Sequence, residues 1–212
     1  VTELAWVIKD AGFPKPLVMK SYFILPPEEF WGSPDFIKPN IYQLTKIEMR
    51  HLMTGKPLMQ VLLELAADIK TYGVDAVAGH NAINFDKPFL EAKVAQSKLA
   101  HFDGLFDILW IDTAFDIVYP EDCRYTNLMY VAAYHQMLNP FSHAALFDVM
   151  TMLKVLDHYD IAAVAERAKS PWCFVSADVG YDNRQLAKDR RYNWENHGTQ
   201  TFPKTWVKRI KE

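Results

Sequence analysis

The sequence contains few cysteines and no long apolar stretch. Its two cysteines, Cys123 and Cys173, are too few for a disulfide scaffold, which favours a reducing, cytoplasmic compartment. No apolar run approaches the roughly 18 residues that a membrane-spanning helix requires, and no signal-peptide pattern opens the chain. We therefore expect no membrane partner. The formal net charge of -3 provides no overall basicity that would indicate nucleic acid as a ligand.

Charge is nevertheless distributed unevenly along the 212 residues. Residues 1–170 carry 15 Lys and Arg against 21 Asp and Glu, whereas residues 171–212 carry 8 against 5. An acidic body with a basic tail favours two units with different roles, although a swing of this size also arises by chance. The chain is long enough for one ordinary domain and a small appendage.

The pattern of apolar residues predicts alternating strands and helices. Strands are expected at 1–8, 17–25, 76–78 and 105–111, and helices at 43–53, 57–71, 86–96, 113–118, 126–137, 143–158 and 160–168. Such alternation favours an α/β fold for residues 1–170. Because the chain opens without Met, on residues that already form a strand, we expect that the sequence begins inside a domain.

The end of the chain has a pattern of its own. A strand at 172–179, a helix at 183–191 and a strand at 205–210 are expected to form a small β-α-β module over residues 171–212. A unit of this size is near the lower limit for independent folding.

Asp86 is the first candidate functional residue. It lies in the stretch Gly79–Leu90, GHNAINFDKPFL, between an expected strand and an expected helix. Loops at the ends of strands often carry the functional residues of α/β proteins. The alternative is that Asn84 or Asp86 only caps the helix, whose first turn contains Pro88.

His143 and Asp148 form a second candidate pair, in the mainly apolar helix at 143–158. A carboxylate buried in such a helix requires a metal or another cation. Alternatively, Asp148 belongs to a solvated face with Thr151 and Lys154, since the three lie within about 120° of arc. An ideal helix separates His143 from Asp148 by roughly 140°, so the pair converges only if His143 precedes the helix and reaches back.

The order of these patterns resembles the DEDDh (DnaQ-like) family of 3′–5′ exonucleases. GHNAINFD resembles the second motif of that family, HAALFD resembles its third, and VTELAWVI resembles the strand that follows its first motif. Between the second and third motifs, Asp112-Thr113 follows a strand and Leu128 lies in a helix, in the order that the family shows. The resemblance covers residues 1–160.

This resemblance implies an RNase H-like fold, with a mixed sheet flanked by helices, and hydrolysis of terminal phosphodiester bonds of DNA. It implies two divalent ions, Mg²⁺ or Mn²⁺, with Asp86 and Asp148 as metal ligands and His143 as the general base. Oxygen ligands suit these ions, and histidine suits a base near neutral pH. The expected partners are single-stranded DNA or DNA 3′ ends, and a polymerase or another replication or repair protein.

The chain departs from the family at its first motif, because no Asp-x-Glu pair precedes VTELAWVI. Glu3 lies within the later strand and does not match. Two carboxylates are too few for two divalent ions, and the absent strand would be central in the sheet. We expect either that residues before Val1 supply the motif or that the chain is an inactive nuclease-fold module that binds nucleic acid. A metal-independent hydrolase using His143 and Cys123 is not favoured, because the chain has no nucleophile elbow.

The tail, VGYDNRQLAKDRRYNW closing with WVK, resembles a small module of the V-x-Y-x-x-[KR]-x-x-A-K…W…W type that is appended to nucleic-acid enzymes. Basic and aromatic residues interleave in it, as they do in surfaces that bind single strands. Alternatively, its tryptophans form the core of the module. The candidate nucleic-acid-binding residues are Arg184, Lys188, Arg191, Trp194 and Trp206.

Overall fold

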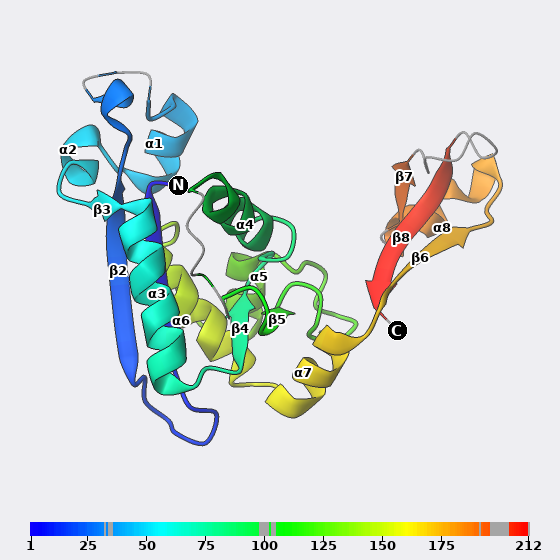
Figure 1. The fold of residues 1–212 in the computed structure, drawn as a ribbon. Helices are drawn as coiled ribbons and strands as arrows, with labels where there is room; N and C mark the ends of the chain where they lie inside the picture. The colour runs from blue at the N-terminus through cyan, green and yellow to red at the C-terminus, as the bar shows by residue number, and fades with distance from the viewer. Residues whose placement is uncertain are drawn as a thin grey trace. The chain divides into compact units, whose positions relative to one another are not determined.

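The computed structural model describes residues 1–31, 33, 36–97, 102, 105–190, 192–195 and 204–211, apart from the side chain of Arg209. The chain divides into two compact units, Val1–Ala168 (unit 1) and Lys169–Glu212 (unit 2). Figure 1 shows their elements. Unit 1 combines sheets with flanking helices, which confirms the α/β prediction. No helix in the described part of the chain is long and apolar enough to cross a membrane.

The described strands of unit 1 are β1 (Glu3–Ile8), β2 (Val18–Leu25), β3 (Lys56–Pro57), β4 (Ala76–Gly79) and β5 (Leu109–Asp112). The helices are the 3-10 turn η1 (Glu28–Phe30), α1 (Pro39–Thr45), α2 (Met49–Leu52), α3 (Leu58–Tyr72), α4 (Asp86–Ser97), α5 (Leu128–Tyr134), α6 (Ala145–Leu156) and α7 (Ile161–Lys169). The expected helix at 43–53 is wrong. Lys46 takes a left-handed conformation that ends α1, and a capping box between Glu48 and His51 starts α2.

The strands of unit 1 form two separate sheets. β1 pairs with β2 in antiparallel fashion, from Glu3 opposite Phe23 to Ile8 opposite Val18, and β3 adds a short parallel pairing to β2. β4 and β5 pair in parallel. Within the described residues, β1 and β4 each have a strand partner on one side only. Each therefore presents an edge that no described strand covers.

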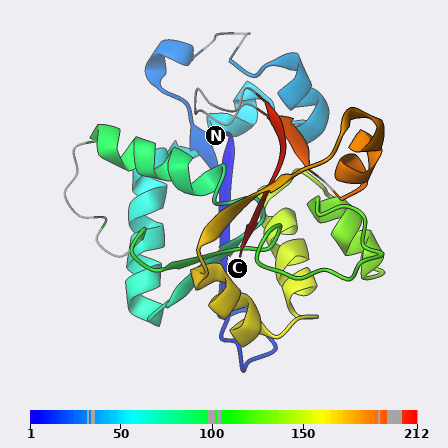
Figure 2. The same cartoon turned by 90° about the vertical axis from the view of Figure 1, so that its right-hand side faces the viewer.

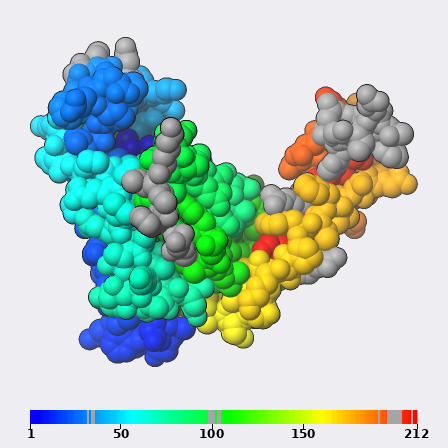
Figure 3. All heavy atoms as spheres, in the orientation of Figure 1, coloured from blue at the N-terminus to red at the C-terminus, as the bar shows by residue number. Residues whose placement is uncertain are grey.

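Helix α3 covers one face of the β1–β2 sheet. Trp6 and Ile8 of β1 form a buried cluster with Val61 of α3. The polar side of the helix also binds the sheet, because Asp68 accepts a hydrogen bond from Trp6 Nε1 (2.9 Å) and pairs with Lys20 (2.6 Å). Figure 3 shows α3, in cyan, over these strands.

Helix α6 lies on the other side of β1 from α3, as Figure 2 shows. Side chains alternate along a strand, so the odd-numbered Glu3 and Lys9 point to one face. Glu3 Oε2 accepts the N–H of Ala145 at the start of α6 (2.9 Å), and Lys9 pairs with Asp157 directly after its end. Six residue steps of strand and twelve of helix each span roughly 18–20 Å. The two elements therefore match in length and are joined at both ends.

The two sheets share one apolar interior. Leu62 of α3, Leu90 of α4 and Trp110 of β5 form a buried cluster. Leu4 of β1 contacts this cluster as well as the cluster around Trp6. The apolar contacts thus continue from one sheet to the other, although the strands β1 and β4 are not paired.

The turns that follow β4 and β5 are built around Asp112, a fully buried carboxylate. Its oxygens accept the N–H groups of Asn81 (2.8 Å), Ile83 (3.0 Å) and Ala114 (3.0 Å). One charged side chain thus supplies the backbone hydrogen bonds that hold both turns in place.

The expected helix at 113–118 is also wrong, because this segment forms turns. The side chain of Asp116 accepts the N–H of Asp112 (2.6 Å), and Asp112 accepts that of Ala114. Aspartate side chains that bind nearby backbone groups compete with the hydrogen bonds of a helix. The pattern of apolar residues does not reveal this competition.

Unit 2 is an antiparallel sheet with a short helix. Its described elements are β6 (Trp172–Ala177), η2 (Tyr181–Asn183), α8 (Arg184–Asp189), β7 (Asn193–Glu195) and β8 (Thr205–Lys211). β8 is central, with β6 on one side and β7 on the other. β7 adds a strand to the expected β-α-β pattern.

Replacing Asp112 with Ala is expected to destabilise the protein strongly. Three N–H groups would lose a buried acceptor, at about 1–3 kcal/mol each, and urea unfolding should show a large fall in the midpoint. Asp75→Ala is the matched control, because Asp75 is exposed directly before β4. Equal midpoints for the two variants would contradict this role of Asp112.

The open edge of β1 leads to a prediction about amide exchange. The Thr2 carbonyl accepts the N–H of Ile24, so backbone groups of even-numbered residues point to β2 and that of Ala5 points away. In the 212-residue chain studied by itself, we expect the Ala5 amide to exchange faster than the Trp6 amide in hydrogen-exchange NMR. Equal protection of the two amides would mean that another strand covers this edge in solution.

Candidate active site

The candidate site begins at the carboxyl ends of the parallel strands β4 and β5, where α/β proteins commonly bind ligands. Gly79 ends β4 directly opposite Asp112. A Cβ atom on Gly79 would lie 2.5 Å from the Cβ of Ala82, so the chain folds back closely here only with glycine. Asn81 follows in a left-handed conformation, with φ of 62°, and donates its N–H to Asp112.

Asp86 is the first residue of α4, and its side chain is exposed. The neighbouring groups partly shield the Asp86 carboxyl from water, which raises its pKa. The Asp112 carboxylate adds to the shift. A carboxylate that reaches solvent and is disfavoured by its surroundings gains from the approach of a cation.

His143 and Asp148 meet through the loop before α6. Asp148 lies in the first turn of the helix, and His143 precedes its first residue. The N–H of His143 donates to both carboxylate oxygens of Asp148 (3.3 and 3.2 Å). His143 has a left-handed φ of 68°, and its side chain is exposed. The histidine thus reaches back to the carboxylate from outside the helix.

The Asp148 carboxylate is half-buried and tied to the protein on one side. Asn139 Nδ2 donates to Oδ1 (2.8 Å). Burial raises the pKa of Asp148 and Glu3 adds to the shift, while the hydrogen bond from His143 opposes it. A carboxylate offers about four lone-pair positions, so Oδ2 keeps acceptor capacity for a cation. Lys154, which the solvated-face alternative groups with Asp148, pairs with Asp157 (3.5 Å).

Glu3 is a site residue to which the sequence analysis assigns no role. By binding the first N–H of α6, it brings a second carboxylate close enough to raise the pKa of Asp148. The available signal is a charged residue in an otherwise apolar strand.

His80 is a second residue that the sequence analysis does not single out. Burial lowers the pKa of its ring, and Nδ1 bonds to Thr113 Oγ1 (2.9 Å). The carboxylates of Asp112 and Asp148 both act against this lowering of the pKa. The turn that carries His80 therefore lies within electrostatic reach of the end of β5 and of the first turn of α6.

The structure joins His143 to Asp148 and leaves Asp86 on a separate turn. Across the part of the chain that the structure describes, no three His, Cys, Asp or Glu side chains are grouped to hold a metal ion. The carboxylates that act on the pKa values of Asp86 and Asp148 are Asp112 and Glu3, respectively. The oxygen donors suit Mg²⁺ or Mn²⁺, but two carboxylates do not complete a site.

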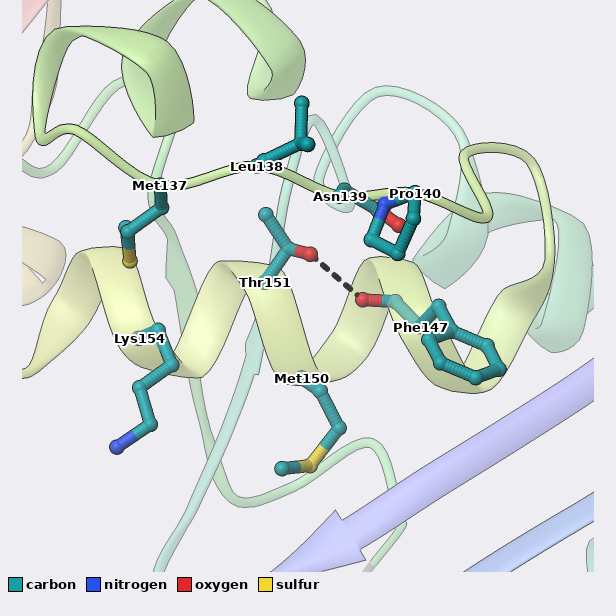
Figure 4. A pocket seen from close by; sticks show the side chains of 8 residues that line it. All are labelled: Met137, Leu138, Asn139, Pro140, Phe147, Met150, Thr151 and Lys154. Carbon is teal, nitrogen blue, oxygen red and sulfur yellow. Dashed lines mark hydrogen bonds between the residues drawn. The ribbon is translucent and has the colours of Figure 1, made fainter.

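A hollow of about 410 Å³ borders the loop before α6. Figure 4 shows Met137–Pro140 running beside the helix, opposite residues that include Phe147 and Met150. Most of the lining is apolar. Asn139 therefore both borders this hollow and holds Asp148.

In unit 2, two candidate tryptophans lie side by side. Trp194 of β7 is opposite Trp206 of β8, and their ring centroids are 5.3 Å apart. Trp194 is 53% exposed, so it is not a core residue. Lys208 lies two residues after Trp206 and hence on the same face of the sheet.

The basic candidates of unit 2 lie on α8 or close to it. Arg184 begins the helix and stacks on the ring of Tyr181 at 3.9 Å, and Lys188 lies in its last turn. Arg191 lies outside the described residues.

Comparison with known proteins gives one kind of match. No family model matches the chain, and no curated protein matches its sequence. Among solved structures, a 3′-exonuclease studied for 3′-end specific recognition of a histone mRNA stem-loop is similar, with a TM-score of 0.57 and 13% identity. The match covers 74% of this chain and 70% of that chain. The chain therefore has a mixed α/β fold, with sheets flanked by helices, that is similar to the fold of a 3′-exonuclease.

Proposed function

We propose that the chain is a metal-dependent 3′–5′ exonuclease that hydrolyses terminal phosphodiester bonds of DNA, with single strands as its substrate. The observation that carries the proposal is the pairing of His143 with Asp148. An exposed imidazole is held through its own backbone to a carboxylate whose pKa is raised. The fold similarity to a 3′-exonuclease supports the same class of reaction.

In this reaction, a water oxygen bonds to the terminal phosphorus while the bond from phosphorus to the preceding 3′ oxygen breaks. The proton of the water passes to His143, because histidine is an effective base near neutral pH, and the released 3′ oxygen takes a proton from solvent to become the new 3′ hydroxyl. His80 does not compete for this role, since its ring is bonded to Thr113 and burial lowers its pKa. Asp86 and Asp148 would hold the divalent ions, which when bound stabilise negative charge on the phosphoryl oxygens.

The open edges of the two sheets suggest where further metal-binding carboxylates would lie. β1 and β4 each have a side that no described strand covers, yet Leu4 and Val77 contact the same apolar cluster. We propose that a further strand lies between these edges and carries the acidic pair of the first motif. Such a strand would join the two sheets into one mixed sheet.

We propose that unit 2 binds the single-stranded nucleic acid that unit 1 cleaves. Trp194, with Trp206 beside it, offers a ring to an unpaired base, and Arg184 and Lys188 offer charge to phosphates. Stacking and charge of this kind bind single strands with little dependence on sequence.

The alternative function is a nuclease-fold module that binds nucleic acid without cleaving it. The lack of a three-residue metal cluster in the described ranges favours this alternative. The two functions differ in one outcome. In both, the protein binds a nucleic-acid strand, but only the exonuclease shortens that strand.

The first test is the shortening of 5′-labelled single strands of DNA and RNA with Mg²⁺ or Mn²⁺. We expect stepwise loss from the 3′ end that requires the metal and is faster on DNA. His143→Ala should lower the rate by about 10²–10⁴-fold, as is typical when a general base is removed. Asp148→Asn and Asp86→Asn should lower it as well.

Asp75→Asn is the control for these variants, because it removes an exposed carboxylate directly before β4, at the other end of that strand from the turn that leads to Asp86. Its rate should equal that of the unchanged protein. Full activity of His143→Ala would overturn the assignment of the base. Binding without any shortening would favour the alternative, and the absence of both would exclude the two functions together.

The second test concerns unit 2 and measures the anisotropy of a labelled oligonucleotide at several salt concentrations. Trp194→Ala should weaken binding by about 1–3 kcal/mol, the contribution of one stacked base. Arg184→Ala should lower the salt slope by roughly 0.7, as expected for one lost phosphate contact to a single strand.

Phe174→Ala is the matched control for the loss of Trp194. Phe174 is 62% exposed, on the same sheet, but it lies on the opposite face, because its neighbour Val175 pairs with Lys208. If Phe174→Ala and Trp194→Ala weaken binding equally, the tryptophan face is not the binding surface.

A further inference from the structure

Asn139 connects the loop before α6 to the Asp148 carboxylate. Its side chain is buried, with 5% exposed, and uses both ends of its amide. Oδ1 accepts the N–H of Phe141 (3.0 Å), and Nδ2 donates to Asp148 Oδ1 (2.8 Å). If the amide were flipped, its oxygen would face the Asp148 Oδ1 atom, and no hydrogen bond could form. The two partners therefore fix the orientation of the amide.

His143 completes this connection from the other end of the loop. Its N–H donates to the same carboxylate, and its φ of 68° is uncommon for a residue other than glycine. An uncommon backbone conformation persists where the surrounding contacts hold it. Asn139 and Asp148 supply such contacts, one on each side of the loop.

We propose that Asn139 is a positioning residue, which holds the Asp148 carboxylate and the His143 backbone in one fixed arrangement. The proposal rests on the exonuclease function proposed above. Asn139 occupies part of Oδ1 and leaves Oδ2 with acceptor capacity toward a cation. The base and the metal ligand then keep their relative position, because both are tied to the same short loop.

The test uses Asn139→Asp, which separates the two hydrogen bonds of the amide. Aspartate still accepts the N–H of Phe141, but it cannot donate to Asp148 and sets a second carboxylate against it. We expect kcat to fall by about 10–100-fold, a loss typical for residues that orient a metal ligand, with little change in KM. The exchange rate of the His143 amide, measured by NMR, should rise.

Asn127→Asp is the matched control, because Asn127 Oδ1 only accepts the N–H of Tyr130 at the start of α5 (2.9 Å). Aspartate serves equally well in such a cap, so kcat and the exchange of the His143 amide should not change. Asn139→Ala removes both bonds and should lower kcat at least as far as Asn139→Asp does.

Two results would overturn the role of Asn139. One is a normal kcat and a normal His143 exchange rate in Asn139→Asp. The other is a low kcat in Asn139→Ala alone, which would assign the effect to the bond with Phe141. If the unchanged protein cleaves no strand, the proposed function fails. The amide-exchange comparison then still decides whether Asn139 holds the loop.

Discussion

The attachment of α6 along β1 determines where the candidate chemistry of unit 1 lies. Glu3 fixes the first turn of the helix and Lys9 fixes its end, so Asp148 cannot slide relative to the sheet. The inner side of the same helix places Val155 and Leu156 in the core with Ile111 of β5. A shift of α6 would therefore move the candidate ligand and disturb the contact with the second sheet at the same time.

Carboxylates that accept backbone N–H groups recur throughout unit 1, but they are not equivalent. Asp112 accepts three such groups and is fully buried, so it shapes two turns. Asp148 accepts from two donors, the Asn139 amide and the His143 N–H, and remains half-buried beside an exposed histidine. The same interaction is thus structural where the carboxylate is fully buried, and available for chemistry where the carboxylate still reaches solvent.

The sequence predicts the elements that depend on local patterns and misses those that depend on side chains binding backbone. The apolar run of β1 and the apolar stripe of α3 are visible in the sequence, and so are the motifs that contain Asp86, His143 and Asp148. The turns after β5 are not, because the pattern of apolar residues does not show that the side chains of Asp112 and Asp116 accept backbone N–H groups in the fold. Glu3 and Asn139 are hidden for a related reason, since their partners lie on other segments of the chain.

The open edge of β1 also affects how the chain behaves among other molecules. An uncovered strand edge is a template for a strand from any source, and natural proteins usually protect such edges with a bulge, a charge or a covering segment. Here the edge runs beside an apolar interior that extends to β4. Self-association of this chain should therefore rise with its concentration, and the yield of monomer should depend on whether a strand is present to close the sheet.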